Sequence, residues 1–190
     1  MERKTDLRVI KTFNKLAFAL RDMLTEGSFD DISVFDLCAK AGIRRATFYK
    51  HFEDKLDFLT HVIEKILDDM TMSVKQNYTL IDDPVEYITN YVKHIILFFD
   101  ERGKLFNSII ASNSFPLVFD TVTTHTMELI RKNLDDAAMP KDSSRYQKIM
   151  TAEFINGGIS TMLINWLRDR SISEERFLDQ VRTLLCKLLF

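Results

Sequence analysis

Residues 32–56 read ISVFDLCAKAGIRRATFYKHFEDKL, and this stretch decides the fold of the N-terminal part of the chain. Ser33, with Asp36 three positions later, forms a capping-box pattern that predicts a short helix ending at Ala41 and Gly42. The following residues, 43–52, leave room for a second helix of just over two turns. Two short helices around a glycine-containing turn are the layout of a helix-turn-helix, whose second helix enters the major groove of DNA.

The second helix and the turn before it are locally basic. Residues 39–52 contain no acidic residue and four basic ones, which are Lys40, Arg44, Arg45 and Lys50. Local basicity of this kind indicates a face that contacts phosphates, although a solvated polar surface would have the same composition. Ile43, Phe48 and Phe52 have the spacing of residues that face a core.

The strings ISVFDLCAKAGI (residues 32–43), ATFYKHF (46–52) and Lys55-Leu56 resemble the signature of the TetR/AcrR family of bacterial transcription regulators. The resemblance covers residues 7–60 and implies that Thr47, Tyr49 and His51 contact DNA, and that Lys55 holds a phosphate. It also implies a dimeric regulator, most often a repressor, that a small molecule releases from double-stranded DNA. The region 154–173 is similar to a C-terminal type found in Firmicute regulators of dihydroxyacetone kinase.

We expect Arg44 and Arg45 to read bases, because a guanidinium group matches O6 and N7 of guanine; both side chains could equally hold phosphates. Arg44 stands where the family has a serine that caps the second helix of the helix-turn-helix, called the recognition helix. An arginine cannot accept hydrogen bonds from the free amides of the first turn. We therefore expect the cap energy of about 0.5–2 kcal/mol to be missing.

The composition predicts an all-α protein. Of 190 residues, 46% are hydrophobic, while only five are glycine and three are proline, which leaves few turns for a β-sandwich. No apolar run reaches the roughly 18–20 residues of a membrane span, and the charged start lacks a signal-peptide pattern, so we expect a cytosolic protein with no membrane partner. Both cysteines, Cys38 and Cys186, lie in apolar helical patterns and are expected to be buried.

The resemblance implies a DNA-binding domain at 1–55 and a ligand-binding and dimerisation domain at 56–190, and the charge is split at the same place. The first segment carries 11 Lys/Arg against 9 Asp/Glu, and the second 15 against 19. Apolar periodicity and capping signals predict nine helices, at 4–26, 33–41, 43–52, 55–76, 84–100, 104–111, 116–136, 144–170 and 174–190.

The last two of these helices carry more apolar surface than one core contact uses, which predicts a four-helix interface between two copies of the chain. Glycines inside a helix cost roughly 1 kcal/mol each, a penalty that close helix approach would explain. An ordinary core within one chain is the alternative. The residues assigned to the dimer interface are Gly157, Gly158, Met162, Trp166, Phe177, Val181, Leu184 and Leu188.

Aromatic residues between the long connecting helix and the eighth helix predict the region of a small-molecule cavity. Each of them could instead belong to a plain core, and the two polar residues Glu153 and Asn156 could face either the interior or water. No cluster of charges points to the interior, so an uncharged, largely apolar or aromatic ligand is favoured. The residues assigned to this site are Tyr87, Tyr91, Phe98, Phe99, Phe106, Phe119, Glu153 and Asn156.

We expect no catalytic residues, no metal and no cofactor. His61 with Glu64, and His125 with Glu128, have a spacing superficially like that of helical di-iron sites, but the order of residues is reversed and exposed ion pairs are favoured. The sequence contains no HExxH, phosphate-binding loop or nucleophile-elbow string. A helical adaptor that binds only protein remains a third possibility.

Overall fold

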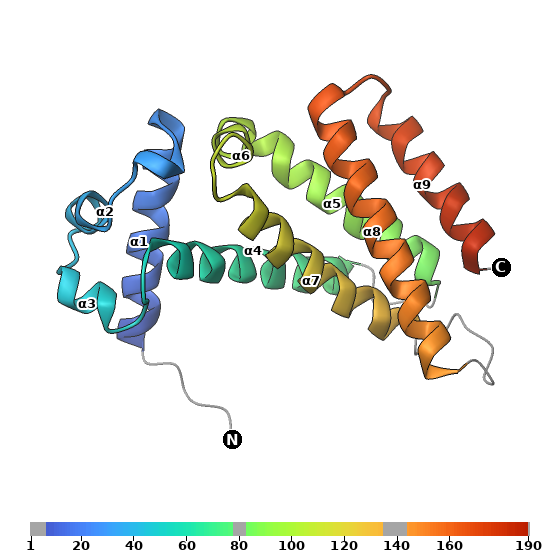
Figure 1. Ribbon diagram of the computed structural model, residues 1–190, viewed down its shortest axis with the longest axis horizontal. Coiled ribbons are helices and arrows are strands. Elements are labelled where there is room, and N and C mark those ends of the chain that lie inside the picture. Colours follow the sequence, from blue (N-terminus) through green and yellow to red (C-terminus); the bar gives the residue numbers. More distant parts are fainter. Residues whose placement is uncertain (1–6, 78–82, 135–143, 190) are drawn as a thin grey trace. The chain divides into compact units, whose positions relative to one another are not determined.

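The computed structural model describes residues 7–77, 83–134 and 144–189, without the side chains of 75–77, 104–106 and 133. Within these ranges the protein is all-α and contains no strand, which confirms the predicted fold class (Figure 1). Its α-helices are α1 (Leu7–Glu26), α2 (Val34–Ala41), α3 (Arg45–Tyr49), α4 (Lys55–Asn77), α5 (Pro84–Glu101), α6 (Gly103–Ile110), α7 (Phe115–Asn133), α8 (Arg145–Asp169) and α9 (Glu174–Leu189).

The expected helices are present with two differences. The second helix of the helix-turn-helix is α3, which has five residues and is shorter than the predicted span 43–52. A short 3₁₀ helix, η1 (Phe29–Asp31), lies between α1 and α2 and was not predicted. Residues 137–143, between the predicted helices 116–136 and 144–170 and expected to form a loop, lie outside the described residues.

Local capping explains several helix starts. The Ser144 hydroxyl accepts from the Gln147 amide while the Gln147 side chain accepts from the Ser144 amide, a complete capping box at the start of α8. Asp83 accepts from the amide of Val85 at the start of α5, and Ser173 accepts from the amide of Arg176 at the start of α9.

The chain divides into two compact units, and the first comprises Met1–Ile63 with Arg102–Phe119. Its buried residues on α1 are Leu16, Ala19, Leu20 and Leu24. Helix α6 belongs to this unit because it packs on α1, where the Ser108 hydroxyl donates to the Gly27 carbonyl at 2.7 Å. The unit therefore contains more of the chain than the segment 1–55.

The second unit comprises Glu64–Glu101 and Asp120–Phe190. In its core the rings of Trp166 and Phe177 stack with centroids 4.8 Å apart, and the Trp166 indole donates to the Ile172 carbonyl at 2.9 Å. Val181 is buried in the same cluster. Ion pairs Glu86–Arg182 and Asp100–Arg170 link α5 to α9 and to the end of α8.

Cys38 is buried as expected, but the expectation for Cys186 is wrong because its side chain is exposed. Cys186 follows the buried Leu185 directly, and one residue turns a helix by about 100°, which carries the thiol away from the core. No described helix is long and apolar enough to span a membrane.

Candidate nucleic-acid interface and interior polar cluster

The turn between α2 and α3 is built by residues that the sequence singled out. Ser33 caps α2 by accepting from the Asp36 amide at 3.1 Å. Gly42 ends α2 with φ of 65°, in the left-handed region that glycine enters without a side-chain clash. This turn ends α2, and α3 begins three residues later at Arg45.

An aromatic cluster holds α3 in place. Phe48 is fully buried, and its ring centroid lies 5.3 Å from that of Phe52 and 5.8 Å from that of Phe58. The ring centroid of Phe13 on α1 lies 6.4 Å from that of Phe52 and 5.9 Å from that of Phe58. The predicted core positions Phe48 and Phe52 are buried, while Ile43 is half-buried. A short helix that cannot be stable by itself is thus fixed through one side chain.

The rest of α3 and its flanks present polar and basic groups to solvent. Arg44, Arg45, Tyr49 and Lys50 are exposed, and Thr47 and His51 are half-buried. The Arg45 guanidinium lies 5.9 Å from the centre of the Tyr49 ring. Among the described side chains, no carboxylate forms an ion pair with Arg44, Arg45 or Lys50, whereas Lys40 pairs with Glu26 at 3.7 Å. The structure therefore gathers these α3 residues into a positively charged surface that is free to meet an anion.

The expectation for the helix cap is confirmed. Arg44 is the N-cap residue of α3, and its side chain makes no capping hydrogen bond. Only its carbonyl is used, accepting from the amides of Thr47 and Phe48 at 2.8 and 3.2 Å. The arginine side chain is consequently not tied to its own helix.

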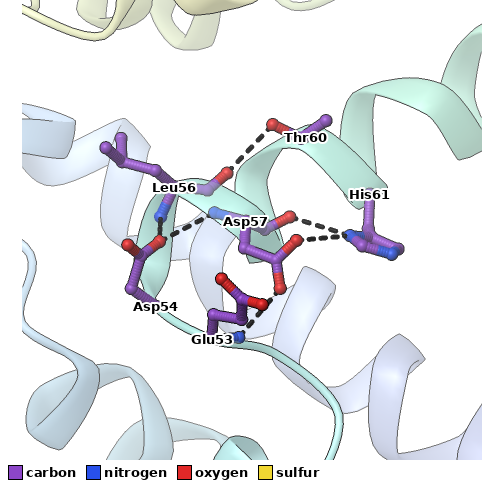
Figure 2. A network of polar contacts seen from close by, with 6 residues as sticks. All are labelled: Glu53, Asp54, Leu56, Asp57, Thr60 and His61. Atoms are coloured by element: carbon purple, nitrogen blue, oxygen red, sulfur yellow. Dashed lines mark hydrogen bonds and ion pairs between the residues drawn. The ribbon is translucent and has the colours of Figure 1, made fainter.

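The start of α4 carries a polar network that sequence reasoning missed (Figure 2). The Asp54 carboxylate accepts from the amides of Leu56 and Asp57 at 2.7 and 2.9 Å, and Asp57 accepts from the Glu53 amide at 2.8 Å. The signal was present in the sequence, because two carboxylates three residues apart before an apolar run form a capping pair. These carboxylates occupy the positive end of α4 themselves.

His61 also belongs to this network. Its Nδ1 atom lies 2.9 Å from the Asp57 carbonyl and 3.3 Å from the Asp57 carboxylate. The predicted pairing with Glu64 is wrong, because Asp57, one turn earlier, provides both acceptors. The predicted exposed pairing of His125 is not seen either, since His125 Nε2 lies 3.1 Å from the Thr71 hydroxyl. Among the residues that the structure describes, no three potential ligands gather into a metal site.

Lys55 has a different environment from the one that the resemblance implied. Its ammonium group donates to the main-chain carbonyls of Phe29, Asp30 and Ile32, at 3.1, 2.9 and 2.9 Å. It also lies 5.0 Å from the centre of the Phe29 ring. All three N–H bonds are therefore used inside the protein, where they attach the start of α4 to η1. A phosphate could take this ammonium only by replacing those bonds.

The residues assigned to a cavity separate into three groups. Tyr87, Tyr91 and Asn156 are buried, while Phe98, Phe99 and Phe119 are half-buried. Of the two alternatives for Glu153, the one that faces water holds, because Glu153 is exposed on α8, and its assignment to the ligand site is wrong. The side chain of Phe106 lies outside the described residues. The structure adds three polar residues that the sequence did not reveal: Thr71 and Thr126 lie beside Tyr91, and His125 contacts Thr71.

The residues assigned to a dimer interface differ in their burial. Trp166, Phe177 and Val181 are buried within the second unit, so their assignment to the exposed interface is wrong. Leu184, Leu188 and the two glycines are exposed, and Met162 is half-buried. Two further apolar residues of α8, Met150 and Phe154, are 51% and 68% exposed. Together with Gly157 they form a stripe along α8 at helical spacing.

A helix-turn-helix with an exposed basic second helix, joined to a larger all-α unit, is the architecture of a DNA-binding transcription regulator. Residues 89–187 match a sequence family described as the C-terminal region of a transcriptional regulator. The match covers more than half of the chain, and the chain belongs to the TetR family of transcription regulators.

Individual relatives agree with this assignment. An uncharacterised HTH-type transcriptional regulator of Bacillus subtilis (strain 168), YxbF, is 35% identical over 81 residues, which are 40% of this chain. The matched region spans only 21% of YxbF. Similar solved structures include a protein assigned to the TetR family from Syntrophomonas wolfei, with a TM-score of 0.69, 19% identity and 94% of each chain covered.

Two further structural relatives have more specific descriptions. The dihydroxyacetone kinase operon activator DhaS has a TM-score of 0.60 and 19% identity, covering 94% of this chain and 96% of its own. RolR, solved in complex with the ligand resorcinol, has a TM-score of 0.64 and 16% identity, covering 95% of this chain and 90% of its own. At these identities the similarity concerns the fold.

Proposed function

We propose that the protein is a dimeric repressor that binds a near-palindromic operator through α3 and leaves it when a small molecule binds in the second unit. The observation that carries the DNA contact is the surface of α3, where Arg44, Arg45 and Lys50 are exposed without a carboxylate partner in the described part of the chain. Thr47, Tyr49 and His51 flank them, so the proposed DNA-binding residues lie on and beside one helix.

Two observations support control by a small molecule. Buried polar side chains gather in the second unit, where a hydrophobic core by itself would not require them. A structural relative, RolR, is described in complex with resorcinol. Helix α4 joins the two units through an unbroken helix from Lys55 to Asn77, and is the proposed lever.

Repression is the proposed sign of control, and the operon activator DhaS shows that a protein of this fold can have the opposite sign. A reporter gene placed behind an operator selected from a random DNA library distinguishes repression from activation. Repression predicts that expression falls when the regulator is produced and recovers on addition of the inducer. An increase in expression on production of the regulator would contradict it.

The DNA contact is tested by selecting binding sequences from a random duplex library. We expect a near-palindrome with half-sites about 34–36 Å apart, or a modest extension of that spacing. Arg45→Ala should weaken binding by about 1–3 kcal/mol and relax the preference at one base position, because it removes one guanidinium without disturbing the buried Phe48.

The matched control is Lys65→Ala, which removes an exposed cation from α4, where it pairs with Asp69 at 2.6 Å. Its affinity for the selected operator should equal that of the wild type. A library that yields no enriched sequence would contradict the proposal and favour an adaptor that binds only protein.

The proposed dimer uses the exposed faces of α8 and α9, and its two glycines offer a test. A Cβ added at Gly157 or Gly158 would meet no atom of the described residues within 4 Å outside its own stretch of α8. The double variant Gly157→Ala/Gly158→Ala should therefore stabilise α8 by about 1 kcal/mol per position in a monomer. In a dimer with closely packed helices the same methyl groups should weaken association by about 1–3 kcal/mol.

Sedimentation over a range of concentrations measures the affinity of the two subunits for each other. Urea unfolding measures the stability that α8 contributes. Gly103→Ala on α6, where a Cβ also meets open space, is the control that should leave association unchanged. A double variant that associates as tightly as the wild type would remove the glycines from the interface.

A further inference from the structure

A group of buried polar side chains lies inside the second unit, contributed by four helices. Thr71 comes from α4, Tyr91 from α5, Thr126 from α7 and Asn156 from α8, and each is more than nine-tenths buried. His125 of α7 joins them through Thr71. We call these five residues the interior polar cluster. The core of the second unit is apolar and includes Val74, Ile88, Val92, Ile155 and Ile159.

The hydroxyls of the two threonines are already used as donors. Thr71 donates to the Leu67 carbonyl at 2.9 Å, and Thr126 donates to the Val122 carbonyl at 2.7 Å. Their oxygens can therefore act only as acceptors toward other groups. Because the Thr71 hydrogen is committed, the 3.1 Å contact with His125 assigns the hydrogen to Nε2 of the histidine, which donates to Thr71.

Two members of the cluster have unused hydrogen-bonding capacity. The Asn156 amide donates through Nδ2 to the Thr123 carbonyl at 2.9 Å, while its Oδ1 atom has no partner among the described residues. The Tyr91 hydroxyl lies beside Thr71 and Thr126 without completing a hydrogen bond of standard geometry within the described chain. One side chain thus offers an acceptor, and the other offers both a donor and an acceptor. Buried groups left in this condition destabilise a protein unless something binds to them.

The two groups with unused capacity belong to side chains that both contact α7. The Asn156 amide is attached to Thr123, and the Tyr91 hydroxyl lies beside Thr126, so their contact points on α7 are three residues apart. Three residues correspond to a rise of about 4.5 Å along a helix. Two hydrogen bonds of about 2.8 Å that meet at one oxygen span a similar distance.

Thr71, Tyr91, Thr126 and Asn156 offer no charged group with which to hold an ion. Burial raises the pKa of Tyr91 to about 12, so its hydroxyl keeps its proton at neutral pH. Among the described residues, no lysine or arginine forms a hydrogen bond or ion pair with the cluster. A carboxylate or phosphate bound here would lose its hydration without a compensating cation.

We propose that the interior polar cluster recognises a neutral, mostly apolar molecule through one hydroxyl group, which donates to Asn156 Oδ1 and accepts from the Tyr91 hydroxyl. This inference rests on the proposed function, because it names the chemical class of the inducer, an alcohol or phenol. The sequence predicted an uncharged, largely apolar or aromatic ligand, and the proposal adds that this ligand carries a hydroxyl. An apolar ligand without one would leave Asn156 Oδ1 and the Tyr91 hydroxyl unpaired. Thr71 belongs to α4, so the cluster that reads the hydroxyl also includes the helix that leads to α3.

Matched pairs of neutral probes test the inference, each pair differing in a hydroxyl or a methyl group: phenol with toluene, p-cresol with p-xylene, and cyclohexanol with methylcyclohexane. Binding to the full chain is measured by calorimetry or ligand-observed NMR at millimolar probe concentrations. In at least one pair we expect the hydroxyl compound to bind about tenfold tighter or more, because a site built for a hydroxyl is left with unpaired groups by the analogue. Tyr91→Phe and Asn156→Leu should each remove most of this preference.

Tyr146→Phe is the matched control, because it deletes the same hydroxyl from a tyrosine of α8 that is exposed to water. It should keep the wild-type preference. A second readout needs no ligand: Tyr91→Phe should leave Tm unchanged or raise it, since among the described residues the deleted hydroxyl has no hydrogen-bond partner to lose.

Three outcomes would overturn the inference: no hydroxyl probe binds, both members of every pair bind equally, or Tyr91→Phe retains the preference. If the wild type still binds its selected operator in that case, only the ligand class fails. If no operator is found, the proposed function fails as well.

Discussion

Phe48→Ala is expected to lower the free energy of unfolding of the first unit by about 3–5 kcal/mol, which is the cost of deleting a fully buried aromatic ring. Phe48 is the one fully buried side chain of α3, and its ring contacts those of Tyr49, Phe52 and Phe58. Because α3 has only five residues, no other core contact of its own replaces this one. Operator binding should be lost together with stability.

Urea unfolding followed by circular dichroism measures the change in stability, and fluorescence anisotropy with labelled operator measures binding. Phe35→Ala is the matched control on α2, where the same ring is 63% exposed. It should change stability by no more than about 0.5 kcal/mol. A cost for Phe48→Ala below about 1 kcal/mol would show that α3 is held by contacts other than this ring.

Lys55→Met is expected to destabilise the first unit by about 1.5–3 kcal/mol, a range typical of hydrogen bonds to charged groups. The substitution keeps the aliphatic stem but removes the ammonium group from the carbonyls of Phe29, Asp30 and Ile32. Those carbonyls then lose a donor, and the start of α4 loses its attachment to η1. The expected effect is a lower Tm with a weaker but equally salt-dependent affinity for DNA.

The salt dependence separates this structural role from a phosphate contact. Loss of one phosphate contact lowers the slope of log K against log salt by about 1, whereas loss of an internal bond leaves the slope unchanged. Lys65→Met, at the exposed pair with Asp69, is the control and should alter neither stability nor slope. A variant with wild-type Tm and a reduced slope would return Lys55 to the phosphate-binding residues.

The positions of the helices could be predicted because their signals are local. Ser33, Gly42 and Ser144 act on groups within three or four residues of themselves, so the sequence around each contains all the information that its cap requires. Asp54 obeys the same rule and could have been recognised from its spacing to Asp57.

The environment of Lys55 could not be predicted in the same way. Its acceptors are 23 to 26 residues earlier in the chain, and only the packing of α4 near η1 brings them to the ammonium group. The interior polar cluster could not be predicted from the sequence either, because its members come from four helices. No local pattern in the sequence connects one member with another.

By itself, the sequence determined an all-α protein with a helix-turn-helix, a basic recognition helix that lacks its usual cap, and an apolar pair of helices at the end. Only the tertiary structure decided which apolar residues of that pair lie inside the chain: Trp166 and Phe177 stack within the core, while Phe154 and Leu188 face outward. The physical reason is that helical periodicity gives the direction of a side chain around its own axis. Burial depends on which other helix lies in that direction, and that is a property of the packed molecule.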